Sequence, residues 1–127
     1  MPELILESLK GKKNFDELFK AGLRYKVEDL LAVVIKNDSS KNNPSSNRII
    51  FYAVAVSKRI AKKAVVRNRI KRLLRESIRL LFIKNPDNFE IISKIILMWR
   101  NAPVKPAFIK LNDVMPIVEK MMLKINR

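Results

Sequence analysis

The chain has 127 residues, a formal net charge of +15 and neither histidine nor cysteine. This length suits one domain with a single core, and the missing residue types exclude disulfides, thiolate metal sites and nucleophile–histidine pairs. The sequence contains two glycines, which excludes a P-loop and a dinucleotide-binding fingerprint. The excess of Lys and Arg predicts an acidic partner, either a nucleic acid or an anionic membrane surface.

The N-terminal region carries no recognisable targeting segment. Residues 1–3 lack the basic start and apolar core of a signal peptide, and no apolar run approaches the ~20 residues that cross a bilayer. We therefore expect an intracellular, cytoplasmic protein. Residues 1–13 are expected to form a lead-in to the first regular element.

A short helix is predicted after this lead-in. Asn14 is a suitable N-cap with Glu17 three residues later, as in a capping box, and Gly22 suits the position after the helix end. Phe15 and Phe19 share a face with Leu18, which we expect in the core. The two phenylalanines fit either core packing or, near solvent, stacking on unpaired bases.

Three apolar runs are predicted to be strands: residues 30–35, 49–56 and 94–99. Residues 38–47 are rich in Asp, Ser, Asn and Pro and are predicted to form a flexible loop. Residues 101–110 are expected to be irregular.

A final helix is predicted near the C-terminus, with Asn112 or Asp113 as its N-cap. Pro116 would then fall in the first turn, where backbone amides have no intrahelical partner. One helix face gathers apolar side chains expected in the core: Val114, Ile117, Val118, Met121 and Ile125.

Residues 57–79 dominate the charge pattern, with nine Lys or Arg and no acid between Lys58 and Arg75. Helical periodicity from Val66 onward separates a basic face from an apolar arc that excludes Ile78 and Phe82. The arc contains Val66, Ile70, Leu73, Leu74, Ser77, Leu80 and Leu81.

The basic face favours nucleic-acid binding over mere solubility. Arg67, Lys71 and Arg75 follow one another at four-residue spacing with no acid among them. Such like-charge neighbours weaken a helix, whereas solvated helices normally mix signs. A bound polyanion would relieve the repulsion.

The same stretch resembles the signature of the bacterial ribonuclease P protein component. In that family a V-S-K-K turn leads through A-V-x-R-N-R-x-K-R-x-x-R into a helix. Here it stands as Val56-Ser57-Lys58-Arg59, then Ala64-Val65-Val66-Arg67-Asn68-Arg69-Ile70-Lys71-Arg72 and Arg75. A weaker likeness extends from about Leu9 to the C-terminus, and residues 12–20 resemble the family's K-x-x-D-F-x-x-V/L-F-K motif.

The pattern of helix, strands, basic helix, strand and helix predicts an α+β protein with helices layered on one sheet. The resemblance implies more: a single domain over residues 1–127, a two-layer α/β sandwich with about four strands and three helices, and a left-handed βαβ crossover carrying the basic helix. Roughly 98% of such crossovers are right-handed, so periodicity alone would not suggest this one.

The resemblance also implies a function. The chain would be the protein subunit of ribonuclease P, binding the catalytic RNA and the 5′ leader of precursor tRNA. It would assist the RNA-catalysed, magnesium-dependent endonucleolytic removal of that leader. Magnesium is expected to be held mainly by the RNA, and no membrane or obligate protein partner is expected.

By the same resemblance, residues of the basic stretch would contact RNA and two aromatics of the first helix would line a cleft for the leader. The RNA-binding set is Lys58, Arg59, Lys62, Lys63, Arg67, Asn68, Arg69, Lys71, Arg72 and Arg75, and the leader-binding pair is Phe15 and Phe19. The family often has an aromatic at the position of Val33 and commonly has glycine at those of Ala53 and Ala61.

No catalytic or metal-binding residue is predicted on this chain. The acids Asp16, Glu17, Glu28, Asp29, Asp87 and Glu90 fall in no metal-binding motif, and neighbouring acids point to different faces of a helix or strand.

Two other classes stay open. A ribosomal or ribosome-assembly protein would share the charge and size, but would not need Phe15 and Phe19 near solvent. A DNA-binding protein would place the basic helix in a major groove, although Asn68 is then its only uncharged base-reading candidate. An anionic-membrane helix fits less well, because its basic face is too wide and lacks a Trp at the apolar edge.

Overall fold

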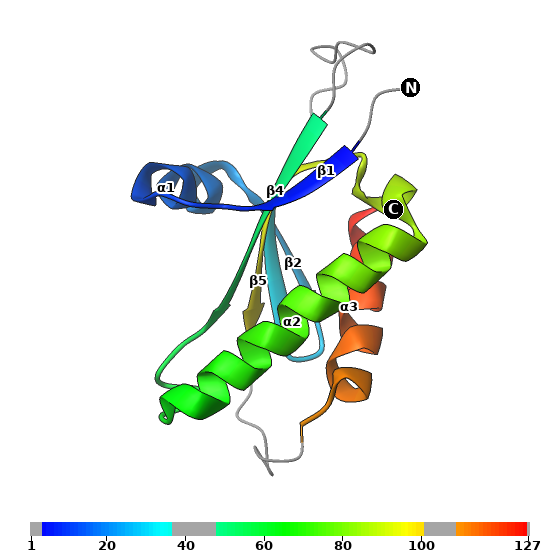
Figure 1. Ribbon diagram of the computed structural model, residues 1–127. Coiled ribbons are helices and arrows are strands. Elements are labelled where there is room, and N and C mark those ends of the chain that lie inside the picture. Colours follow the sequence, from blue (N-terminus) through cyan, green and yellow to red (C-terminus); the bar gives the residue numbers. More distant parts are fainter. Residues whose placement is uncertain (1–3, 37–47, 101–108, 127) are drawn as a thin grey trace.

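The computed structural model describes residues 4–36, 48–100 and 109–126. One mixed sheet has α1 on one face and the two long helices α2 and α3 on the other (Figure 1). In chain order the elements are β1 (Leu4–Ser8), α1 (Lys12–Ala21), β2 (Leu23–Val27), β3 (Leu30–Lys36), β4 (Arg48–Val56), α2 (Ala64–Lys84), the 3₁₀ helix η2 (Pro86–Phe89), β5 (Ile92–Trp99) and α3 (Leu111–Ile125).

The sheet has five strands in the order β1-β4-β5-β3-β2. β4 is parallel to both of its neighbours, β1 and β5, whereas β3 is antiparallel to β5 and β2. α2 is therefore the crossover between two adjacent parallel strands. The predicted α+β class, the βαβ unit and the three apolar strands are confirmed, and the handedness of the crossover stays a prediction.

Two edge strands were not predicted from the sequence, and the sheet has five strands where about four were expected. Residues 4–8, expected to be part of a lead-in, pair with residues 48–52 of β4. β2 is a short strand of alternating polar and apolar residues beside β3. Edge strands of five residues carry a weak local pattern, and their hydrogen bonds depend on distant partners.

The predicted ends of α1 are wrong in detail. Gly11 is the N-cap, with a φ of 91°, and Asn14 lies within the helix, where its side-chain amide donates to the Lys10 carbonyl at 2.7 Å. Gly22 is the C-cap and has an extended backbone. Glycine is needed there because a Cβ atom would collide with the Leu18 carbonyl oxygen and a methyl group of Val33.

The final helix also starts earlier than predicted. α3 begins at Leu111, and the Lys110 amide donates to the Asp113 carboxylate at 2.8 Å. Asp113 therefore lies inside the first turn of α3 and caps the helix by accepting a hydrogen bond from the residue before it. Pro116 lies beyond the first turn and not within it. The predicted apolar face is confirmed, since Val114, Val118, Met121 and Ile125 are buried and Ile117 packs against the core.

The main core lies between the sheet and the pair α2 and α3, and a smaller one lies between the sheet and α1. α2 buries most of the predicted apolar arc, but the buried face is rotated slightly from the predicted one. Ile78, which was excluded from the arc, is buried, whereas Leu80, which was included, is exposed. The one buried polar side chain of the described core, Ser77, donates its hydroxyl to the Leu73 carbonyl at 2.8 Å. Its burial therefore leaves no polar atom without a partner.

The predicted loop at residues 38–47 lies outside the described residues, as does most of the irregular segment expected at 101–110. Within the described part of the chain, no helix is both long and apolar enough to cross a membrane.

Candidate nucleic-acid interface

The predicted basic stretch forms a tight turn followed by α2. In the turn, the Ser57 carbonyl accepts from the backbone amides of Ile60 and Ala61, both at 3.1 Å. Ala61 is buried and Ile60 packs against the core, so the cations on either side of them are directed outward. Those exposed cations are Lys58, Arg59, Lys62 and Lys63.

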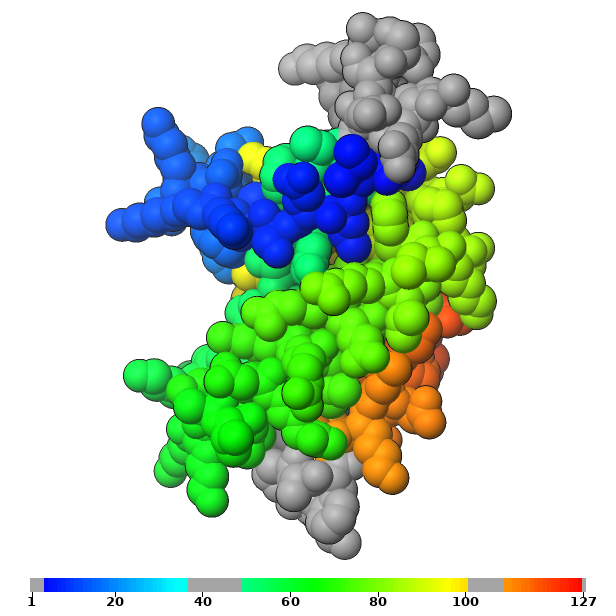
Figure 2. Space-filling model, viewed as in Figure 1, coloured from blue at the N-terminus to red at the C-terminus, as the bar shows by residue number. Residues whose placement is uncertain are grey.

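The first half of α2 continues this cationic surface. Asn68, Arg72 and Arg75 are exposed and Lys71 is half-buried, and none of the four bonds or pairs through its side chain with any residue the structure describes. Figure 2 shows α2 running uncovered across this face of the molecule. The side chains are therefore available to an external anion.

Arg67 is already engaged by the protein. It is half-buried, and its Nη1 donates to the carbonyls of Ala61 at 2.9 Å and Lys62 at 2.8 Å. One guanidinium nitrogen thus ties the turn to the first turn of α2, and the other two nitrogens make no bond to the residues the structure describes.

Arg69 is engaged more firmly. Its Nε and Nη2 both donate to the carbonyl of buried Ile109, at 3.0 and 2.8 Å. This two-pronged contact fixes the residues before α3 against α2. This structural role could not be predicted from the sequence, because nothing in a basic motif distinguishes a guanidinium directed at the protein from one directed outward.

The predicted aromatic pair lies on α1, on the opposite face of the sheet. Leu18 is fully buried against Val33 and Ile96, which confirms its core role. Phe15 is half-buried beside this cluster, and Phe19 is 40% exposed. One aromatic ring is therefore open to solvent, as stacking on a base requires.

The floor beside α1 is apolar and incompletely covered. Ala53, Ala55 and Met98 lie on the same sheet face and are only partly buried. Val33 is fully buried, so it cannot provide the solvent-facing contact that an aromatic would provide there.

The two alanines at positions where the family commonly has glycine cause no backbone strain. Ala53 lies in β4, and Ala61 ends the turn before α2. Among the described non-glycine residues only Glu28 has a positive φ. The strand end and the turn therefore follow paths that alanine adopts readily.

The acids of the described segments do not gather in one place. No group of three or more Asp, Glu, His or Cys side chains within the described ranges could hold an ion. Glu17 instead pairs with Lys94 of β5, with 3.2 Å between the carboxylate and the ammonium. A lone lysine within an apolar strand was the signal that could have revealed this contact.

Comparison with known proteins decides the family. A family model described as Ribonuclease P matches residues 6–114. The chain belongs to the ribonuclease P protein family. This confirms the family predicted from residues 56–75.

Curated relatives support the same assignment. The ribonuclease P protein component of Rickettsia bellii is 37% identical over 94 residues, covering 74% of this chain and 76% of that protein. The ribonuclease P protein component of Microcystis aeruginosa is 31% identical over 108 residues, covering 84% and 78% respectively.

Solved structures show the same fold at low identity. The ribonuclease P protein of Thermotoga maritima superposes with a TM-score of 0.68 and 19% identity, covering 92% of this chain and 96% of that chain. The Staphylococcus aureus protein gives a TM-score of 0.65 and 21% identity, with 94% of both chains covered. The fold is thus retained although most side chains differ.

Arg69 is hydrogen-bonded to the protein and Arg72 is not bonded to any described residue, so their substitutions should affect stability differently. Arg69→Ala leaves the buried Ile109 carbonyl without both donors, and should lower the free energy of unfolding by about 1–3 kcal/mol in urea titrations. Arg72→Ala removes an exposed side chain and should change it by less than about 0.5 kcal/mol. Equal values for the two variants would contradict the structural role of Arg69.

Proposed function

We propose that the chain is the protein subunit of ribonuclease P, acting in the cytoplasm on precursor tRNA together with the catalytic RNA. The observation that carries this proposal is the row of cations, most of them exposed, that leads from the turn at residues 57–63 into α2 and whose members, apart from Arg67 and Arg69, bond through their side chains to none of the residues the structure describes. That row coincides with the stretch whose motif resembles the family signature, in a chain that belongs to the family.

The catalytic RNA would bind along this row. Lys58, Arg59, Lys62 and Lys63 would extend the contact before the helix, followed by Lys71, Arg72 and Arg75, with Asn68 giving a directed hydrogen bond. Arg67 and Arg69 would contribute through the N–H groups that the protein leaves free. Such phosphate contacts position an RNA and carry little sequence information, and the planar guanidinium of Arg suits two-pronged phosphate binding.

The 5′ leader of precursor tRNA would pass along α1. Phe19, with its exposed ring, and the half-buried Phe15 offer stacking surfaces next to the apolar sheet floor. Stacking grips any base, because every base has a π-face, so leaders of unrelated sequence can be held.

In this proposal the protein binds the two RNAs, and the catalytic RNA carries out the cleavage. Magnesium ions held mainly by the RNA would activate the attacking water. The described residues of this chain contribute no acidic cluster for an ion. Its own residues would bind and orient the two RNA partners.

Arg72→Ala should weaken binding to the catalytic RNA and flatten its salt dependence by about one released ion, because one phosphate contact is lost. Filter binding over a range of salt concentrations measures both quantities. Lys84→Ala is the matched control, since it removes one exposed cation at the far end of the same helix. An unchanged salt slope for Arg72→Ala would remove this residue from the interface.

Phe19→Ala should weaken binding of precursor tRNA to the holoenzyme about fivefold or more, because one base loses its stacking surface, while mature tRNA binds as before. Ile83→Ala, which trims another exposed apolar side chain, should change neither affinity. Equal losses for precursor and mature tRNA would contradict a leader-binding role and favour a ribosomal type of RNA binding.

A further inference from the structure

A hollow lies on the sheet face that carries α1. It has a volume of about 560 Å³, and its walls include Asn14 of α1 together with side chains from β1, β4 and β5. At about 100° per residue, Asn14 and Glu17 lie to one side of the inward-facing Leu18, whereas Phe15 and Phe19 lie to the other. The hollow is therefore separated from the aromatic pair by the width of α1.

Three side chains of different chemistry stand in a row across this hollow. Glu7 of β1 pairs with Phe51 of β4, which in turn pairs with Lys94 of β5, and all three line the hollow. Neighbouring strands are about 4.8 Å apart, so a carboxylate, an aromatic ring and an ammonium span about 10 Å. One nucleotide can cover such a row, with its base over the ring.

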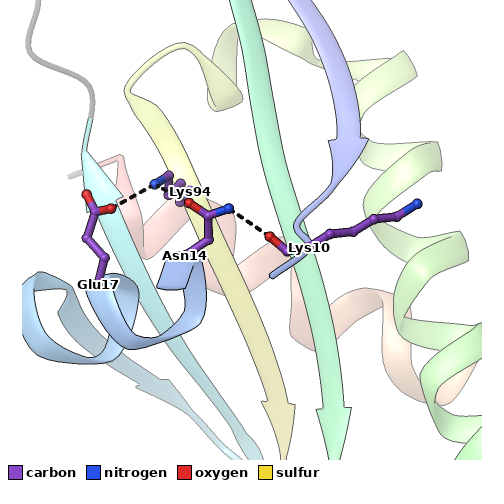
Figure 3. Close-up of polar contacts among 4 residues, drawn as sticks. All are labelled: Lys10, Asn14, Glu17 and Lys94. Carbon is purple, nitrogen blue, oxygen red and sulfur yellow. Dashed lines mark hydrogen bonds and ion pairs between the residues drawn. The ribbon is translucent and has the colours of Figure 1, made fainter. Parts of the chain in front are cut away.

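Lys94 is held in place by α1. Its Nζ lies 3.2 Å from a carboxylate oxygen of Glu17 and 3.4 Å from the side-chain oxygen of Asn14, whose amide is in turn fixed by the Lys10 carbonyl (Figure 3). The Lys94 side chain is only 17% exposed. Two of its three N–H donors are used in these contacts, which leaves one for a ligand.

The partner of Lys94 is exchangeable. The Glu17 side chain is 59% exposed, so its carboxylate can move into water at little cost when another anion approaches. A phosphate would then replace the Glu17 carboxylate as the partner of the Lys94 ammonium, which would donate a charge-assisted hydrogen bond to it.

We propose that this hollow binds one nucleotide of single-stranded RNA. The base stacks on Phe51, the phosphate displaces Glu17 from Lys94, and Glu7 accepts a hydrogen bond from a base amino group or a ribose hydroxyl. The inference rests on the proposed function, in which the nucleotide belongs to the precursor leader upstream of the part held by Phe15 and Phe19. A free nucleotide has the same chemistry and is distinguished below.

The first test compares the two members of the ion pair in the reconstituted holoenzyme, using precursor tRNA with a long leader. Lys94→Gln should weaken binding about fivefold, whereas Glu17→Gln should strengthen it, because the competing carboxylate is gone. Asp16→Asn makes the same charge change on the outer side of α1 and should have a smaller effect. If the pair only fastens α1 to the sheet, both Lys94→Gln and Glu17→Gln weaken binding, and the proposal is overturned.

The second test varies the leader one nucleotide at a time and compares Phe51→Leu with Phe51→Tyr. Loss of the ring in Phe51→Leu should leave short leaders unaffected and weaken long ones about fivefold or more, while Phe51→Tyr retains the wild-type length dependence. The hollow could instead bind a free nucleotide. In that case the protein would bind AMP saturably, Phe51→Leu would abolish this binding, and leader length would have no effect on the variant.

Two experimental results distinguish an error in the proposed nucleotide site from an error in the proposed function. If the wild-type holoenzyme shows no preference for precursor over mature tRNA, the leader-binding function itself is wrong. If that preference is present, but Phe51→Leu changes neither leader-length dependence nor AMP binding, the nucleotide site alone is overturned.

Discussion

The burial of one face of α2 is the constraint on which the rest of this structure depends. α2 connects the parallel neighbours β4 and β5, so it must pack on the sheet, and its apolar side chains fill the main core. The remaining circumference is then forced outward. Because Glu76 is the one acid among the charged residues of α2, the packing that stabilises the fold also creates a cationic surface.

Two arginines of the basic motif hold this surface to the rest of the protein. Arg67 holds the preceding turn against α2, and Arg69 holds the carbonyl of Ile109, forty residues further along the chain. A guanidinium has enough donors to bind a backbone carbonyl and still face a phosphate. Substituting either arginine therefore changes both the shape of the surface and its charge, whereas Arg72 and Arg75 contribute charge alone.

Much of this architecture could be predicted because it is encoded locally. The apolar runs of β3, β4 and β5, the two faces of α2 and the motif around Asn68 are all contiguous in sequence. β1 and β2 could not be predicted, because short edge strands are defined by their neighbours. The same holds for the contact between Glu17 and Lys94, which lie 77 residues apart. Ile78 is buried and Leu80 is exposed, the reverse of the prediction, because the exact rotation of α2 about its axis depends on how it packs against α3 and the sheet.

Reconstitution with a bacterial ribonuclease P RNA tests the central claim most directly. Cleavage of precursor tRNA would be followed at low magnesium with protein and RNA together, with RNA alone and with protein alone. We expect strong activation of the RNA by the protein and no cleavage by the protein alone. Cleavage by the protein alone, or no activation of the RNA, would contradict it.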